Sequence, residues 1–205
     1  MLEENYWDNI WNNQNIGEPN NFAISTFNKI KDKGFVTLLD LGCGDGRDSL
    51  FFASKGLNVT SIDFSKFAIN NLNKLSKEKS LNINSIKHDI TNINFPENSF
   101  DVIYAHLSLH YFDDNVTTKI FDNLFKILKK DGMIFIKCKS TEDLLYGQGK
   151  KIGENIYFKE HLRHFFTETY MKNKLKKFKI LEIKKTSSVY FEYESNFIEA
   201  IASKI

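Results

Sequence analysis

The stretch Val36-Thr-Leu-Leu-Asp-Leu-Gly-Cys-Gly-Asp-Gly-Arg47 decides how this chain is expected to fold. An apolar run ends at Leu41 and opens into glycines at positions 42, 44 and 46, before a helix-like stretch from Asp48 to Lys55. In α/β domains, a strand, a glycine-rich turn and a helix build a ligand site at the carboxyl end of the first strand. Glycine allows positive φ and a close approach of the backbone to a ligand. The stretch therefore predicts an α/β fold with a ligand-binding turn.

The spacing of the glycines separates two classes of ligand. The dinucleotide fingerprint is G-x-G-x-x-G, but here the sixth position is Arg47 and the third glycine comes one residue early. The spacing D-x-G-x-G-x-G resembles motif I of the class I S-adenosylmethionine-dependent methyltransferases, in which the loop wraps the amino-acid end of the cofactor. The resemblance implies that the cofactor contacts Asp40, Gly42, Cys43, Gly44, Gly46 and Arg47.

Length and composition agree with one enzyme-sized domain. The chain has 205 residues, of which 41% are hydrophobic, enough for a sizeable core. The resemblance implies a Rossmann-like, doubly wound, mostly parallel seven-stranded sheet with an antiparallel last strand and helices on both faces. We expect an N-terminal helical lid at 1–33, a cofactor-binding core at 34–139, and a substrate-facing segment with the last strands at 140–205.

Charge and cysteine content limit the expected partners. A formal net charge of +2 is lower than nucleic-acid binders usually carry. Two cysteines cannot form a disulfide framework, and no apolar run is long enough to span a membrane. We therefore expect a cytoplasmic protein, monomeric or homodimeric, that binds neither nucleic acid nor membrane and needs no metal.

Two acids further along the chain complete the expected cofactor site. Asp63 ends the predicted strand 57–62, and Phe64 follows it. A carboxylate there can accept hydrogen bonds from both ribose hydroxyls, although a plain loop acid is the alternative. After the predicted strand 84–87, the resemblance implies that Asp89 bonds the adenine amino group while Ile90 covers the ring; the alternative for Asp89 is a turn residue.

The segment His106-Leu-Ser-Leu-His-Tyr-Phe-Asp113 resembles the family's motif IV region, where cofactor and acceptor meet. The resemblance implies that the backbone carbonyl of Ala105 or His106 holds the methionyl ammonium. His106 and His110 are the candidate catalytic residues, because histidine can act as a general base near neutral pH, and Tyr111 is expected to line the pocket. The alternative for both histidines is a buried structural role.

Both ends of the chain supply candidate residues for the acceptor. Tyr6, Trp7 and Trp11 lie at helical spacing, either as a lid over the site or as a face that docks on the core. The string Arg163-His164-Phe-Phe-Thr resembles tellurite-resistance-type and related small-molecule methyltransferases. Arg163 could pair with an acidic substrate or lie on the surface, and His164 is expected beside the pocket.

The predicted function is transfer of a methyl group from S-adenosyl-L-methionine to a small-molecule acceptor by in-line displacement, which leaves S-adenosyl-L-homocysteine. The alternatives are a methyltransferase acting on RNA or protein, a nicotinamide-dependent Rossmann oxidoreductase, and a fold that binds its ligand without catalysis. The chain lacks the N/D-P-P-Y string of amino-group DNA methylases. The sequence leaves the acceptor and the methylated atom open.

Overall fold

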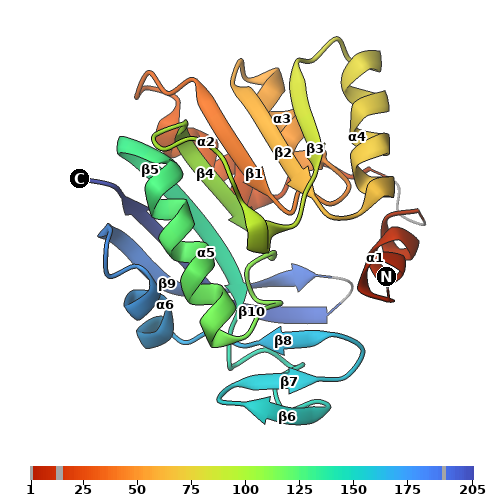
Figure 1. Ribbon diagram of the computed structural model, residues 1–205, viewed down its shortest axis with the longest axis vertical. Coiled ribbons are helices and arrows are strands. Elements are labelled where there is room, and N and C mark those ends of the chain that lie inside the picture. Colours follow the sequence, from red (N-terminus) through yellow and green to blue (C-terminus); the bar gives the residue numbers. More distant parts are fainter. Residues whose placement is uncertain (1, 13–15, 191–192) are drawn as a thin grey trace.

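A seven-stranded, mostly parallel sheet forms the centre of the computed structural model, which describes residues 2–12, 16–190 and 193–205 (Figure 1). Its strand order is β3-β2-β1-β4-β5-β10-β9, and β10 runs antiparallel to both of its neighbours. The strands are β1 (Thr37–Leu41), β2 (Asn58–Asp63), β3 (Ile83–Lys87), β4 (Phe100–His106), β5 (Leu128–Lys139), β9 (Lys179–Tyr190) and β10 (Tyr193–Ser203). This arrangement confirms the predicted fold class. The strand order reverses between β1 and β4, where ligands of open α/β sheets bind.

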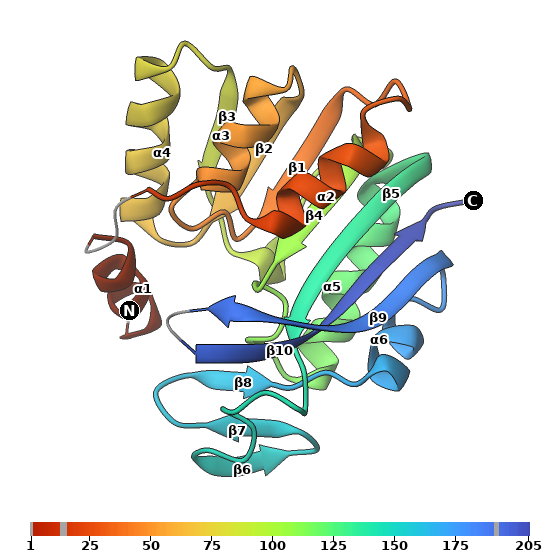
Figure 2. The same ribbon diagram turned by 180° about the vertical axis from the view of Figure 1, so that it is seen from behind.

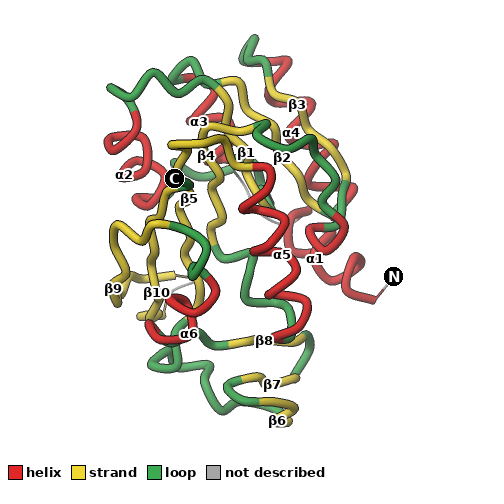
Figure 3. The backbone as a smooth tube through the Cα atoms, turned by 60° about the vertical axis from the view of Figure 1, so that its left-hand side comes forward, coloured by secondary structure: helices red, strands yellow, loops and turns green. Residues whose placement is uncertain are grey.

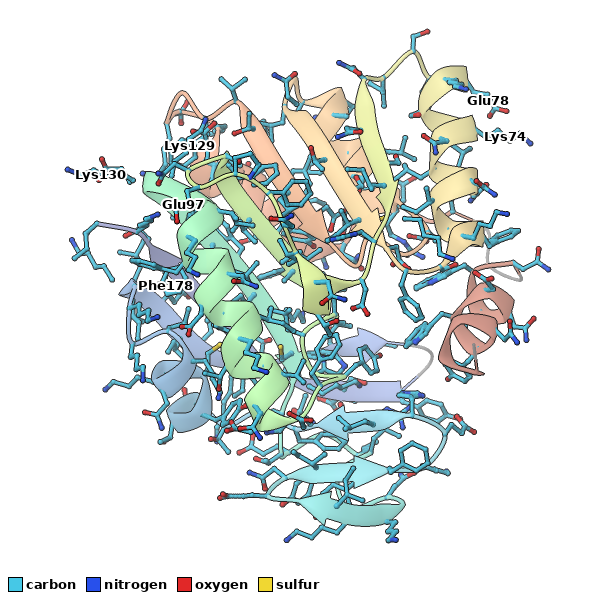
Figure 4. The ribbon with its side chains drawn as sticks, in the orientation of Figure 1. Lys74, Glu78, Glu97, Lys129, Lys130 and Phe178 are labelled. Carbon is cyan, nitrogen blue, oxygen red and sulfur yellow. The ribbon has the colours of Figure 1, made fainter. Side chains whose placement is uncertain are left out.

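Helices cover both faces of the sheet, as the turned view in Figure 2 shows. On one face α2 (Asn21–Ile30), α3 (Arg47–Ser54) and α4 (Lys66–Glu78) contribute to one buried apolar cluster. On the other face α5 (Asp114–Ile127) and α6 (Glu168–Lys174) contribute to a second. Figure 4 shows Lys74 and Glu78 on the outer side of α4, where both are exposed. No helix in the described part of the chain has the length and apolar character needed to cross a membrane.

A second, small sheet was not predicted. It contains β6 (Lys150–Gly153), β7 (Ile156–Phe158) and β8 (Leu162–His164). Strands of three or four residues are too short to show a clear alternation of apolar and polar side chains. Tertiary contacts position the small sheet instead: the His164 N–H donates to the His110 carbonyl at 2.8 Å. Figure 3 shows this sheet at one end of the molecule, below the carboxyl ends of the parallel strands.

Local side-chain hydrogen bonds fix the ends of two helices. α5 begins at Asp114, because the Asp113 side chain accepts from the Val116 N–H. Ser65 caps α4, since its hydroxyl accepts from the Ala68 N–H. Residues 130–132 lie within β5, at a bulge where Asp131 has a φ of +63°.

Asp101 joins the start of β1 to β4. One carboxylate oxygen accepts from the backbone N–H groups of Val36 and Thr37 at 3.0 and 2.9 Å. Lys129, labelled in Figure 4 at this edge, lies 3.0 Å from the other oxygen. Although partial burial opposes ionisation, these donors lower the pKa of Asp101 to about 2.

We expect Asp101→Asn to lower the free energy of unfolding at pH 7 by about 1–2 kcal/mol, because the depressed pKa represents stabilisation of the folded, ionised state. That stabilisation is complete above the unfolded-state pKa and is lost as the pH falls from about 4 towards 2. Urea unfolding of the variant and the parent at pH 7 and pH 3 measures it. Glu97→Gln, on an exposed residue near the same edge (Figure 4), is the control. An equal loss at both pH values would contradict the assignment.

Candidate functional site

A cavity of about 670 Å³ opens at the carboxyl ends of β1, β2 and β4. The glycine turn lines it, and two other parts of the chain that contact each other also reach it: α1 (Leu2–Asn12) and the turn between β7 and β8. Figures 1 and 2 show α1 and the small sheet at this end of the parallel strands. The cavity lies where the order of the strands predicts a ligand site.

Each glycine of the turn has a definite task. Gly42 and Gly44 line the cavity with φ of +72° and +53°, a conformation that L side chains rarely adopt. A Cβ added to Gly44 would lie 2.7 Å from the ring of Trp11. Gly46 is not a lining residue, and a Cβ there would lie 2.7 Å from the Leu72 side chain. Gly46 therefore serves the packing of α3 on α4, while the other two keep the floor of the cavity open.

Asp63 lies at the end of β2 with its carboxylate directed at the glycine turn. One oxygen accepts from the Gly44 N–H at 3.0 Å, and the other accepts from the Ser65 N–H at 2.9 Å. Each oxygen keeps capacity for a further donor. Burial raises the pKa of Asp63 to about 6 in spite of these hydrogen bonds. The position and the free acceptor capacity suit the two hydroxyls of a ribose.

Asp40 is buried at the end of β1 and lines the same cavity. Its carboxyl accepts from the Ser49 hydroxyl at 2.5 Å, and Ser49 in turn accepts from the Ser61 hydroxyl. Burial, reinforced by Asp48, raises the pKa of Asp40 to about 8 despite the Ser49 hydrogen bond. A ligand with a positive charge would relieve the cost of ionising this group.

Asp48 lines the cavity and was not selected by the sequence analysis. It is 5% exposed in the first turn of α3, and its carboxylate accepts from the backbone and side-chain amides of Asn20, both at 2.8 Å. The Tyr104 hydroxyl donates to it at 2.7 Å. Helix N-termini attract phosphates, but at the N-terminus of α3 the buried carboxylate of Asp48 already supplies a negative charge. No local pattern reveals the role, because the donors come from residues 28 and 56 positions away.

Negative charge dominates the walls of the cavity. Arg47 is the only lysine or arginine among the described lining residues, and it forms an ion pair with Asp45, its Nε lying 2.6 Å from an oxygen of that carboxylate. The lining carboxyl groups are Asp40, Asp45, Asp48, Asp63, Asp89 and Asp113. The site therefore favours a ligand with cationic groups over one with a pyrophosphate.

The expected adenine end of the site is more open. Phe64, Asp89 and Ile90 line the cavity, as predicted for cofactor contacts. The Asp89 side chain is exposed and accepts from the Thr91 N–H at 2.8 Å, which caps a short 3-10 helix at Ile90–Asn92. Asp89 thus has the turn role considered in the sequence analysis and also lines the cavity.

The two candidate catalytic histidines occupy different places. His106 lines the cavity, and burial, reinforced by Lys137, lowers its pKa to about 3. His110 is not a lining residue: it is 1% exposed, and its ring lies against Tyr111 with centroids 4.4 Å apart. Burial lowers the pKa of His110 as well, with Lys139 adding to the effect. Both imidazoles are therefore uncharged near neutral pH, and only His106 is positioned to meet a ligand.

The N-terminal aromatic residues close one side of the cavity. Trp7 and Trp11 line it and stack with ring centroids 5.9 Å apart, whereas Tyr6 is not a lining residue. Trp7 also contacts Tyr111, another lining residue, at 5.1 Å between centroids. The Asp8 carboxylate holds α1 in place by accepting from the Ser65 hydroxyl and from the Phe67 N–H.

Other predicted site residues lie outside the cavity. Ala105 is buried in β4, and Arg163 lies on β8 without lining the pocket. His164 is 2% exposed, its Nδ1 is 3.3 Å from the Phe112 carbonyl, and its ring packs on Tyr170. The structure instead places Ser108 and His161 on the wall, two residues that the sequence analysis did not select. Within the described ranges, no group of three or more His, Cys, Asp or Glu side chains is arranged to hold a metal ion.

Comparison with known proteins identifies the type of domain. The family model described as "Methyltransferase domain" matches residues 38–132, from β1 into β5. The chain is 32% identical over 108 residues to the probable S-adenosyl-L-methionine-dependent methyltransferase TehB of Haemophilus influenzae, a match that covers 52% of this chain. It spans only 37% of that relative's length.

Solved structures share the whole architecture. The crystal structure of TehB from Haemophilus influenzae superposes with a TM-score of 0.74 at 22% identity, covering 99% of this chain and 67% of that one. A 1,6-didemethyltoxoflavin-N1-methyltransferase from Burkholderia thailandensis, solved with bound S-adenosylhomocysteine, gives a TM-score of 0.73 at 18% identity over 89% of this chain and 76% of that one. The family model identifies residues 38–132 as a methyltransferase domain, and the glycine turn, Asp63 and these matches make the chain similar to the class I S-adenosylmethionine-dependent methyltransferases.

Proposed function

We propose that this protein transfers a methyl group from S-adenosylmethionine to a small-molecule acceptor. The observation that carries the proposal is the set of carboxyl groups around the glycine turn, opposed by one arginine that is itself paired. S-adenosylmethionine carries an ammonium and a sulfonium, whereas NAD carries a pyrophosphate. The cavity electrostatics therefore favour the first and disfavour the nicotinamide alternative.

Residues of the cavity fit the parts of the cofactor in order. Asp63 would accept from the ribose hydroxyls, Phe64 and Ile90 would enclose the adenine, and the glycine turn with Asp40 would hold the amino-acid end. A bound sulfonium supplies an activated methyl group. The protein has to align the acceptor with it and exclude water, and orientation of this kind can contribute up to about 7–11 kcal/mol to barrier reduction. Trp7 and Trp11 are placed to exclude water from the cavity.

A small acceptor suits the space that is left. Apart from the glycine turn and the expected cofactor contacts, the described lining residues include Trp7, Tyr111, Phe112, Leu162 and Val189, and Arg47 is the only lysine or arginine among all of the described lining residues. The Burkholderia thailandensis neighbour is a 1,6-didemethyltoxoflavin-N1-methyltransferase solved with bound 1,6-didemethyltoxoflavin, which supports a small-molecule acceptor here. An RNA or protein acceptor would need an extended binding surface, and the site is an aromatic-walled cavity.

Calorimetric titration with S-adenosylhomocysteine and, separately, with NAD tests the proposal. We expect micromolar affinity for the first compound and no heat of binding with the second. Binding of NAD alone would overturn the proposed function, and the absence of binding by both would indicate a scaffold that has lost its site.

We also expect the affinity for S-adenosylhomocysteine to depend on pH through Asp63. The ionised carboxylate accepts the ribose hydroxyls, so the contribution of Asp63 to affinity should be full above its pKa of about 6 and fall below it. This one group implies a loss of about tenfold between pH 7.5 and pH 5. Asp40, with a pKa of about 8, adds a separate pH dependence that does not involve Asp63. Asp63→Asn should bind more weakly at pH 7.5 and show a shallower fall in affinity below about pH 6. An unchanged pH profile in that variant would exclude Asp63 as the titrating group.

A further inference from the structure

Three buried polar side chains beside the cavity have atoms without a hydrogen-bond partner among the described residues. They are Ser108 (Oγ), His110 (Nδ1) and His161 (Nδ1 and Nε2), which are 8%, 1% and 4% exposed. Ser108 and His161 line the cavity. Burying a polar group without a partner costs free energy, and folded proteins rarely accept that cost without a reason. His161 is the most informative of the three, because neither of its ring nitrogens has a partner.

Aromatic rings pack around the His161 ring without hydrogen-bonding to its nitrogens. Its centroid lies 5.0 Å from that of Tyr6, 5.7 Å from Trp7 and 5.2 Å from Tyr111. These three rings come from α1 and from the segment after β4, so two parts of the chain that are distant in sequence pack against the imidazole. The hydrogen bond from the His164 N–H to the His110 carbonyl holds β8, the strand that follows His161. The packing therefore fixes the position of the imidazole and leaves both of its ring nitrogens able to hydrogen-bond a ligand.

The charge around His161 defines what that ligand can be. Burial lowers the pKa of His161 to about 4, with Arg163 adding to the effect, so the ring is neutral near pH 7 and offers one donor and one acceptor nitrogen. Its neighbours on the wall are Tyr111, Leu162 and Trp7, all uncharged. The wall offers flat apolar surfaces, and Arg163, the cation that acts on His161 from β8, does not line the cavity.

We propose that His161 is the acceptor-binding residue of this enzyme and that the acceptor is a small, uncharged aromatic compound with a reactive X–H group, such as a phenol, aromatic thiol or arylamine. The proposal rests on the proposed methyltransferase function. The X–H group donates a hydrogen bond to the unprotonated nitrogen of His161. During transfer the methyl–sulfur bond breaks with its electron pair going to sulfur, the methyl–X bond forms, and the proton of X–H passes to His161.

Binding of phenol to the protein saturated with S-adenosylhomocysteine tests this directly, with anisole and benzoate as comparison probes. Anisole has the same ring without the donor, and benzoate adds a negative charge. Histidine ring ¹⁵N spectra report on each of the five histidines, and the signals missing in His161→Phe identify His161. We expect phenol to shift the His161 resonances and to bind at least tenfold more tightly than either comparison probe.

Two matched variants separate binding from folding. His161→Phe keeps an aromatic ring among Tyr6, Trp7 and Tyr111 but removes two unsatisfied nitrogens, so we expect a higher thermal midpoint together with at least a tenfold loss of phenol affinity. His164→Phe is the control, because His164 Nδ1 has a partner in the Phe112 carbonyl. That variant should have a lower midpoint, and its binding of phenol should change less than that of His161→Phe.

Three outcomes would overturn the inference: equal binding of phenol and anisole, tighter binding of benzoate, or unchanged phenol affinity in His161→Phe. A lower midpoint in His161→Phe would also count against it, since it would indicate that the nitrogens are satisfied by bound water. Binding of S-adenosylhomocysteine to the parent protein is measured in the same series. If the parent protein fails to bind S-adenosylhomocysteine, the proposed function itself is wrong. If it binds S-adenosylhomocysteine and any of these outcomes is observed, only the proposed role of His161 is wrong.

Discussion

Gly44→Val is expected to abolish detectable binding of S-adenosylhomocysteine, a loss of at least about 100-fold, or roughly 2.7 kcal/mol. Two effects combine at this residue. Its φ of +53° is unfavourable for any β-branched side chain, and its Cβ would lie 2.7 Å from the Trp11 ring. The new side chain would therefore enter the cavity and displace the aromatic residue that closes it. Calorimetry measures the affinity, and circular dichroism checks that the fold persists.

Gly56→Val is the matched control for this prediction. Gly56 also has a positive φ, +90°, but no atom lies within 4 Å of a Cβ built there. The control therefore carries a comparable backbone strain, of order 1–3 kcal/mol, without an obstruction. We expect it to lower stability and leave the affinity unchanged. Normal affinity in Gly44→Val would contradict the assignment of the turn as the cofactor site.

Asp48→Ala is expected to lower the free energy of unfolding by roughly 3 kcal/mol or more, because each hydrogen bond to a charged group contributes roughly 1.5–3 kcal/mol. The substitution leaves three buried or half-buried donors without their acceptor: the two amides of Asn20 and the hydroxyl of Tyr104. It should also weaken cofactor binding, since Asn20 lines the cavity. Denaturant unfolding measures the first effect and calorimetry the second.

Tyr104→Phe provides the comparison for Asp48→Ala. It removes one of the three donors and keeps the ring between Phe22 and Phe52, so a loss of about 1 kcal/mol is expected. Asp122→Ala, which removes an acid from an exposed ion pair, should cost less than about 1 kcal/mol. If Asp48→Ala cost no more than Asp122→Ala, the buried network would not be what joins Asn20 to the sheet.

Local sequence patterns indicated the start of the central sheet, and the family resemblance implied the rest. The apolar run, the glycine turn and the helix-like stretch after it predict an α/β fold, and the strands predicted at 57–62 and 84–87 are β2 and β3 to within one residue at each end. The resemblance implied the mostly parallel seven-stranded sheet. The cofactor side of the cavity was also predictable, because Gly42, Gly44 and Asp63 belong to one short turn and the strand next to it.

The acceptor side required the tertiary structure. His161 lies in a short segment without periodicity, and its importance comes from contacts with Tyr6, Trp7 and Tyr111, which are distant in sequence. Asp48 likewise depends on Asn20 and Tyr104. The sequence by itself determined the fold and the cofactor turn, since both follow from hydrophobic period and glycine conformation over neighbouring residues. Only the folded chain decided which polar atoms are buried without partners, because that property depends on everything packed around them.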